Sequence, residues 1–368
     1  MIDLDLRRKT TVVCVSVLLI MLAFYGALNT GTAHQIKPGS TLLRQLRSYM
    51  ATTTPKIDGI VGLLEWSEAP SQVIQMCFGG ETVKCLTVNI SLKNDQSYLY
   101  MLIQIPQPGP TSLDELSIRF DGNHDGLTTA YFDSDIKDSI LNKTLARNTD
   151  WYFNGYPNRI QDIDPANDAR GTVDFQRGSS YATGNFQGWI VELAIPFSSG
   201  DFYDMDVRPG AIIGTMINYT YVTSNPPLQT TCYTWPPVSQ FISSCSPSTQ
   251  PPTAWGDIVT TRVWHTNLPR FTRDLTIGGV LYNATALIRN DGTRFSHTVI
   301  HRLTFDGSLI SETSLFSPPS YVRTWSPPVA PDRQVVITSD QPFTVELFLT
   351  YDDGASRTTT TQIIQATL

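Results

Sequence analysis

The clearest strand signal in this chain is Gly188-Trp189-Ile190-Val191-Glu192-Leu193-Ala194-Ile195-Pro196-Phe197, in which two sets of side chains alternate. One set is Trp189, Val191, Leu193 and Ile195, and the other is Ile190, Glu192 and Ala194. Alternation of β-branched and aromatic residues with a period of two predicts a strand with one face in a core. Pro196 ends the strand, because proline has no N–H to donate to a ladder. Glu192 must then either face solvent or be held by a partner.

The composition agrees with a chain built from strands. Its 368 residues include 24 Pro and 24 Gly, with many Thr, Ser, Tyr and Asn, which suits a turn-rich all-β protein. The length allows two or three domains. Charged residues make up 16% of the chain and the net charge is −7, whereas binding of phosphate backbones needs concentrated Lys and Arg. We therefore expect no nucleic-acid partner.

Further strand signals surround this stretch in a first β unit, expected to cover residues 55–262. They lie at 83–92, 97–105, 116–120, 170–175, 211–222 and 257–263, and 131–132 begins another. Two long loops, 133–168 and 223–253, separate some of these strands. Loops this long in a compact domain are usually functional or specially braced.

A second β unit is expected at residues 263–368. Its predicted strands cover 275–282, 285–288, 298–305, 309–314, 334–339, 343–351 and 356–366. Turn residues at 290–292, 306–307 and 352–354 suit tight hairpins. About seven strands in about a hundred residues are typical of an immunoglobulin-like or fibronectin-like sandwich, which most often serves as a spacer or an interaction module.

The N-terminus, residues 1–33, has the pattern of a targeting signal with a hydrophobic helix. Basic residues at 7–9 precede an apolar run at 12–28, whose length lies between a signal-peptide core and a relaxed transmembrane helix. A cleaved signal peptide and an uncleaved membrane anchor both stay open. Either one places the rest of the chain outside the cytoplasm, as an extracellular or cell-surface protein. Residues 34–54 are expected to form a stalk, with a short amphipathic helix near 42–50.

Cysteine usage agrees with export. Cys14 lies in the apolar run, and the other four cysteines are Cys77, Cys85, Cys232 and Cys245. Nearest neighbours would pair 77 with 85 and 232 with 245, while the other two connectivities stay open. Zinc is the weaker interpretation, because no CxxC or HxxxH spacing accompanies them. Four sequons, at Asn89, Asn142, Asn218 and Asn283, are compatible with an exported glycoprotein.

Motifs along the first β unit resemble those of family 9 carbohydrate-binding modules and their DOMON-like relatives. They are Lys56-Ile57-Asp58-Gly59 followed by 64–69, then 98–103, 114–121, 189–196, 209–214 and 255–258. Each motif alone is weak, but their common order and spacing are fairly specific for the fold. The resemblance implies a β-sandwich in a jelly-roll-like arrangement. One fold hosts many functions, so this resemblance alone does not settle function.

A candidate metal loop lies at residues 121–126, with the sequence DGNHDG. A hard cation such as calcium takes several converging oxygens, so Asp121, Asn123 and Asp125 are candidate ligands, with Asp133 or another loop completing the set. The match to a helix–loop–helix calcium hand is incomplete, because the twelfth position is Phe rather than Glu. Members of the resembling family often carry calcium, which the resemblance implies here. A plain Asx turn between two strands accounts for the same residues.

Sugar binding needs exposed aromatic rings to stack on pyranose faces, with amides and carboxylates for the hydroxyls. The candidates are Trp151, Tyr152, Tyr156, Arg159 and Trp235. The resemblance implies a clamp of two aromatics in sugar-binding members, but no pair here aligns with it residue by residue. The alternative is that these aromatics fix the long loops. Three other tryptophans lie in the fold-defining motifs and are expected in the core: Trp66, Trp189 and Trp255.

Enzyme signatures are absent from the sequence, which has no GxSxG elbow, HExxH pair, phosphate loop or Rossmann fingerprint. A haem-binding variant of the fold would need an axial His, but His124 is better explained within the acidic turn. We expect a non-catalytic carbohydrate-binding protein, with a glycan partner and an open, aromatic-lined groove. The alternative is a structural or adhesive cell-envelope component with protein partners, buried loop aromatics and apolar surface patches. An enzyme accessory domain is the third hypothesis.

Overall fold

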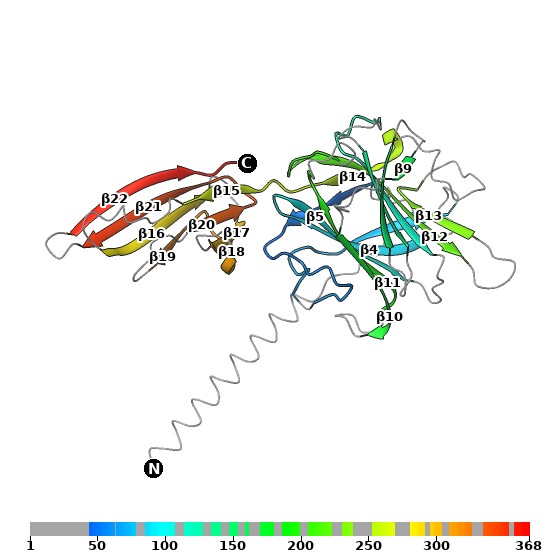
Figure 1. Ribbon diagram of the computed structural model, residues 1–368, viewed down its shortest axis with the longest axis horizontal. Helices are drawn as coiled ribbons and strands as arrows, with labels where there is room; N and C mark the ends of the chain where they lie inside the picture. Colours follow the sequence, from blue (N-terminus) through cyan, green and yellow to red (C-terminus); the bar gives the residue numbers. More distant parts are fainter. Residues whose placement is uncertain are drawn as a thin grey trace, which may run out of the picture. The chain divides into compact units, whose positions relative to one another are not determined.

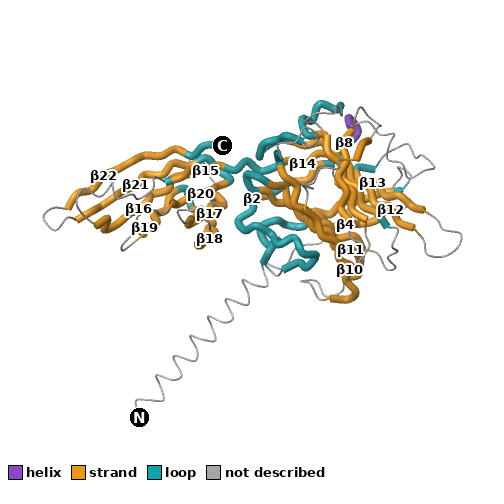
Figure 2. Tube along the Cα trace, in the orientation of Figure 1, coloured by secondary structure: helices purple, strands orange, loops and turns teal. Residues whose placement is uncertain are grey.

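The computed structural model describes most of the chain from residue 44 onward. The described residues are 44–62, 64–78, 85–106, 114–127, 134–140, 147–153, 159–161, 170–179, 186–198, 205–222, 230–237, 252–268, 280–290, 295–303, 309–325, 334–352 and 357–368. They are mostly strands (Figures 1 and 2), which confirms the all-β fold class. Within these ranges no helix is long and apolar enough to cross a membrane. The expected hydrophobic segment at 1–33, with Cys14, lies outside them.

The first β unit is one continuous sheet that folds into two layers. Its strands are β1 (Gln45–Arg47), β2 (Tyr49–Met50), β3 (Gln72–Cys77), β4 (Cys85–Asn94), β5 (Tyr98–Pro106), β6 (Glu115–Asp121), β7 (Ser134–Ile140), β8 (Arg147–Phe153), β9 (Arg159–Gln161), β10 (Arg170–Ser179), β11 (Phe186–Pro196), β12 (Ile212–Val222), β13 (Thr230–Trp235) and β14 (Gly256–Val259), with the short 3-10 helix η1 (Pro252–Ala254) before β14. The order β10-β11-β5-β4-β3 forms layer 1, and β13-β12-β6-β7-β8-β9 forms layer 2. A single register pair, Thr234 with Cys77, joins the layers. Apolar residues of both layers share one core, as expected of a sandwich.

Strand β11 shows why the alternation of residues 188–197 matters. It lies between β10 and β5, and its first set of side chains, including Trp189 and Val191, is buried between the two layers. Its second set is buried as well: Ile190 and Ala194 pack with Trp66 in a separate apolar cluster. Residues near 66 therefore cover the outer face of layer 1, so β11 is enclosed on both faces.

The prediction of an amphipathic helix near residues 42–50 is wrong for the residues of this range that the structure describes. Residues 45–47 and 49–50 are strands, which pair in parallel with β14 and β4. Leu46 and Met50 are buried. Their spacing of four residues fits both a helical turn and two strand periods, and pairing with existing sheet edges decides for the strand. From Arg44 on, the expected stalk contributes to the sheet.

The second β unit contains two four-stranded antiparallel sheets. Its strands are β15 (Trp264–Asn267), β16 (Val280–Asn290), β17 (Ser296–Leu303), β18 (Leu309–Ser317), β19 (Ser320–Trp325), β20 (Gln334–Ser339), β21 (Phe343–Asp352) and β22 (Arg357–Gln365). The sheet orders are β15-β20-β17-β18 and β19-β16-β21-β22. Their facing sides bury a core of Leu268, Ala286, Ile288, Ile300, Val335, Ile337, Phe343, Val345 and Leu347. The immunoglobulin-like or fibronectin-like assignment stays a prediction.

A disulfide joins Cys77 and Cys85, with an S–S distance of 2.00 Å. The two residues face one another across the β3–β4 hairpin. Cys232 is also disulfide-bonded, and its partner lies outside the described residues, as does Cys245. The disulfide therefore joins the two strands at the end of the hairpin where the connecting loop begins and ends.

Leu46→Ala should lower the free energy of unfolding by about 2–5 kcal/mol, because truncating a fully buried leucine leaves a cavity. Urea denaturation followed by tryptophan fluorescence measures the change. Leu64→Ala is the matched control, since Leu64 is 73% exposed whereas Leu46 is 0% exposed. Equal effects of the two substitutions would contradict the packing of the first strand against the core.

Candidate functional site

The outer face of layer 2 is polar yet buried. In β6, Leu116, Ile118 and Phe120 point into the core, so the residues between them belong to the outer face. On that face Ser117 is 6% exposed and Arg119 is 2% exposed. An alternating strand with polar residues on one side normally turns that side to water. Here the polar side is covered, which the sequence does not reveal.

A strip of polar residues crosses this face. Asn218 of β12 is paired in register with Ser117 of β6 on one side and with Thr234 of β13 on the other. The Ser117 Oγ, both amide atoms of Asn218 and the Thr234 Oγ1 are buried and have no hydrogen-bond partner among the described residues. Each such group costs about 1–3 kcal/mol when it stays unsatisfied. The strip therefore calls for ordered water or the polar groups of a ligand.

Asn218 also heads one of the sequons, Asn218-Tyr219-Thr220. Its side chain is only 5% exposed in the interior of β12. In the folded protein this side chain is therefore part of the polar strip rather than an accessible attachment point for a glycan.

The strand register separates the predicted aromatic site residues into two groups. Trp151 lies opposite Ile136, which lies opposite Arg119, so these positions share the outer face of layer 2. Arg159 lies opposite Phe153, two positions after Trp151, and falls on the same face. Tyr152 occupies the intervening position and falls on the other face. Tyr156 lies outside the described residues.

Trp235 does not fit its predicted role as a stacking residue. It is completely buried in the core of the first β unit, so neither face of its ring is open to a sugar. Successive side chains of a strand point to opposite faces, so Trp235 points inward because the preceding residue of β13, Thr234, points outward. Trp66, Trp189 and Trp255 are buried, as predicted.

The predicted metal loop, residues 121–126, is a turn held by side-chain to backbone hydrogen bonds, two of which form Asx turns. The Asp121 Oδ2 accepts from the Gly126 N–H (3.0 Å), the Asn123 Oδ1 accepts from the Asp125 N–H (2.9 Å), and the Asp125 Oδ1 accepts from the Leu127 N–H (2.7 Å). Gly126 has a φ of 78°, which favours glycine. These bonds give the loop the geometry of the plain-turn alternative.

The loop's donor set is chemically suited to calcium, because carboxylate and amide oxygens are the ligands of hard cations and each oxygen can accept more than one partner. His124 contacts Asp257 of β14 (2.9 Å), in agreement with its assignment to the turn. Asp133 lies outside the described residues. Among the described residues, no group of three or more His, Cys, Asp and Glu side chains could hold a metal.

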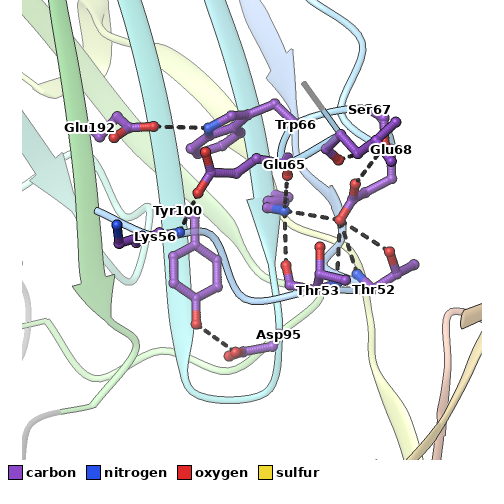
Figure 3. A network of polar contacts seen from close by, with 12 residues as sticks. Thr52, Thr53, Lys56, Glu65, Trp66, Ser67, Glu68, Asp95, Tyr100 and Glu192 are labelled. Carbon is purple, nitrogen blue, oxygen red and sulfur yellow. Dashed lines mark hydrogen bonds and ion pairs between the residues drawn. The ribbon is translucent and has the colours of Figure 1, made fainter. Parts of the chain in front are cut away.

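On the outer face of layer 1, Glu192 is fully buried and held by partners (Figure 3). Its Oε1 accepts from the Trp66 Nε1 (3.0 Å), and its Oε2 accepts from the backbone N–H groups of Gly59 (2.8 Å) and Asp58 (3.2 Å). Burial raises the pKa of Glu192, and these three donors partly oppose that rise. Of the two alternatives for Glu192, exposure to solvent or contact with a partner, the structure therefore shows contact with partners.

Lys93 forms the second centre of this network. Its Nζ donates to the Thr53 carbonyl (2.8 Å), the Glu65 carbonyl (2.5 Å) and the Glu68 Oε1 (2.9 Å). It also lies 5.2 Å from the ring centre of Trp66, in range for a cation–π contact. An ammonium group has three protons to donate, and all three are used. The Lys93 ammonium therefore has no proton left to donate to a ligand.

Burial is the largest influence on the pKa of Glu68 and by itself would raise it. Hydrogen bonds from Lys93 and Thr52, together with the charge of Lys93, outweigh burial, so the pKa of Glu68 is lowered. Burial also lowers the pKa of Lys93, against the influence of Glu68. The pair is stable because each charge is matched by close partners.

Solved structures of family 9 carbohydrate-binding modules are similar to this chain. One, from Caldicellulosiruptor kristjanssonii in complex with cellotriose, is 17% identical, covers 58% of this chain and 92% of that chain, and gives a TM-score of 0.38. Another, from the same organism in complex with glucose, is 17% identical, covers 59% and 96%, and gives a TM-score of 0.39. No protein-family model and no curated protein matches the chain. At this level of likeness no binding residue is transferred.

Glu68→Gln should reduce stability at pH 7 by about 1.5–3 kcal/mol, the range for hydrogen bonds to charged groups. Because its pKa is lowered in the folded state, the contribution of Glu68 is complete above the ordinary value of 4.5 and is lost as the pH falls through the folded value. Urea denaturation at a series of pH values below 6 should therefore show a smaller loss of stability on acidification in the variant than in the wild type.

The control for this experiment is Glu346→Gln, which removes a carboxylate 3.7 Å from the exposed Arg289. Exposed pairs contribute about 0–1 kcal/mol, so its curve should follow the wild type. Parallel pH curves for Glu68→Gln and the wild type would argue against the stabilising role of the buried pair.

Proposed function

We propose that the first β unit is a non-catalytic carbohydrate-binding module whose glycan binds at the outer face of layer 2, which has to open for the sugar because its polar atoms are buried. The observation that carries the proposal is the strip of Ser117, Asn218 and Thr234, whose buried polar atoms have no partner among the described residues. Sugar hydroxyls donate and accept, and the amide and hydroxyl groups of the strip do the same. The strip carries no charge, so it suits a neutral sugar.

The strand register supports a stacking residue on the same face of layer 2, two strands away from the strip. Position 151 of β8 belongs to this face, in the row that runs from Arg119 through Ile136. Position 159 of the next strand, β9, belongs to the same face. An aromatic residue on the same face as a row of polar groups is an arrangement that a carbohydrate site can use. Tyr152, on the opposite face by register, is not part of this proposal.

The proposal includes an extracellular or cell-surface location. It rests on the targeting pattern of residues 1–33 and on the disulfide between Cys77 and Cys85, since disulfides persist in oxidising compartments. An uncleaved N-terminal segment would add a membrane attachment. The second β unit then acts as a spacer or interaction module next to the glycan-binding unit.

A structural or adhesive role is the second candidate, and one observation favours it. The second β unit exposes large apolar side chains, among them Phe295, Phe316, Val322 and Ile363. Exposed apolar residues that gather into patches mark protein contacts. In this role the protein partners would belong to the cell envelope, and no sugar would be bound.

Asn218→Leu is expected to weaken glycan binding at least tenfold, because it removes both polar atoms at the centre of the strip. Isothermal titration with cellotriose, maltotriose and xylotriose measures binding, after circular dichroism has shown that the variant is folded. Trp151→Ala should weaken binding to a similar degree through lost stacking.

Phe316→Ala is the control for Trp151→Ala, since Phe316 is an exposed aromatic of the second β unit. Unchanged affinity in Asn218→Leu would show that the strip holds only water. Failure of the wild type to bind any member of the panel would favour the adhesive role instead.

The proposal also includes calcium at the loop of residues 121–126, held by Asp121, Asn123 and Asp125. Calcium added at a hundred times its dissociation constant should stabilise the fold by about 2.7 kcal/mol, and a chelator should reverse the effect. Thermal unfolding of the wild type and of Asp125→Ala, whose side chain is exposed and therefore dispensable for the core, measures it.

In this calcium experiment, Asp206→Ala serves as the control, because Asp206 is another exposed carboxylate away from the loop. It should retain the calcium shift that Asp125→Ala loses. A wild-type melting temperature that is the same with calcium and with chelator would remove the metal from the proposal.

A further inference from the structure

A pocket of about 580 Å³ lies beside the turn that precedes β12, and two arginines belong to its lining. Its polar lining includes Arg208, Arg262, Gln96 and His265, Leu368 brings the backbone carboxylate of the last residue, and no Asp or Glu side chain belongs to its described lining. This is notable in a chain whose net charge is −7. The volume falls in the range of about 300–1,000 Å³ that small-molecule sites occupy.

Both arginines of this pocket are exposed, and no carboxylate among the described residues neutralises them. The side chains of Arg208 and Arg262 form no hydrogen bond or ion pair with the described residues, unlike Arg289, which lies 3.7 Å from Glu346. The nearest carboxylate in sequence to Gln96 is Asp95. Its oxygens already accept from the N–H groups of residues 97 and 98 and from the Tyr100 hydroxyl.

The backbone under both arginines is fixed. The Ala211 N–H donates to the Arg208 carbonyl (3.0 Å), which closes the turn at residues 208–211. The Thr260 Oγ1 accepts from the Gly210 N–H (2.9 Å) and donates to the Ala211 carbonyl (2.8 Å), so the turn is tied to the segment that leads to Arg262. The two guanidinium groups are thus carried by two segments that are bonded to each other.

Gly210 makes room for the Arg262 stem. It has a φ of 94°, and a Cβ at this position would lie 2.3 Å from the Arg262 Cγ. The stem therefore lies directly against the glycine backbone. A side chain at position 210 would both strain the turn and displace Arg262.

We propose that this pocket binds a small oxyanion-bearing ligand, with Arg208 and Arg262 as the groups that hold its carboxylate, sulfate or phosphate. A guanidinium group has a planar fork of N–H donors that matches these groups in pairs. The Gln96 side chain and the His265 ring, which contact each other, add polar lining. The site is distinct from the uncharged strip on layer 2, and the proposal does not depend on glycan binding.

The test is isothermal titration of the full chain with sodium sulfate, sodium phosphate, acetate and glucuronate at constant ionic strength, with glucose as the neutral probe. We expect at least one anion to bind and glucose not to compete for this site. Arg208→Gln and Arg262→Gln should each weaken binding at least tenfold. Tighter binding of glucuronate than of acetate would identify an acidic sugar, and tighter binding of sulfate or phosphate a free inorganic anion.

Arg323→Gln is the matched control, because Arg323 is an exposed arginine of β19 outside the pocket. Equal weakening by Arg323→Gln and the pocket variants would reveal a non-specific effect of net charge and overturn the proposal. No binding of any anion at millimolar concentration would also overturn it. Gly210→Ala should weaken anion binding to a degree similar to that of Arg262→Gln, because it displaces the Arg262 side chain. Unchanged affinity in a folded Gly210→Ala would overturn the placement of Arg262.

Discussion

The first β unit depends on one buried carboxylate and the three N–H groups that surround it. Strand β11 is enclosed on both faces, and Glu192 lies in its middle. A buried carboxylate without partners would cost more than the surrounding apolar contacts could offset. The partners come from Asp58, Gly59 and Trp66, far earlier in the chain. Satisfying Glu192 therefore also fixes the covering segment over layer 1, and the Lys93–Glu68 pair holds that segment at a second point.

Both outer faces of the sandwich carry buried polar groups, but they differ in whether the described residues supply the hydrogen-bond partners. On layer 1, each proton of the Lys93 ammonium has an acceptor within the protein. On layer 2, Asn218 is as well buried but neither amide atom has a partner among the described residues. A structural polar group has its hydrogen bonds supplied by the fold, whereas a binding group leaves them for a ligand. This contrast within one domain is the reason to place the glycan on layer 2.

The sequence predicted those features that depend only on periodicity. The alternation in residues 188–197 identified β11 and the inward orientation of Trp189, because a strand has one side-chain period. Periodicity cannot tell a solvated polar face from a covered one, so the burial of Ser117 and Arg119 was missed. It also fails when two periods coincide, as at Leu46 and Met50. Trp235 was misassigned because composition suggested an exposed loop aromatic, while register fixes which neighbour of Thr234 points inward.

The unit begins and ends on neighbouring strands, because β1 pairs with β14 in the order Gln45 with Asp257 through Arg47 with Val259. The pairing is parallel, so the chain enters at one end of this strand pair and leaves at the other. Tension applied between Arg44 and Thr260 would pull the two strands past each other along their axes. All the hydrogen bonds of the pair would then resist together, rather than opening one after another as in a hairpin pulled from its ends. The same short pairing that completes the sheet thus acts as a mechanical clamp on the whole unit.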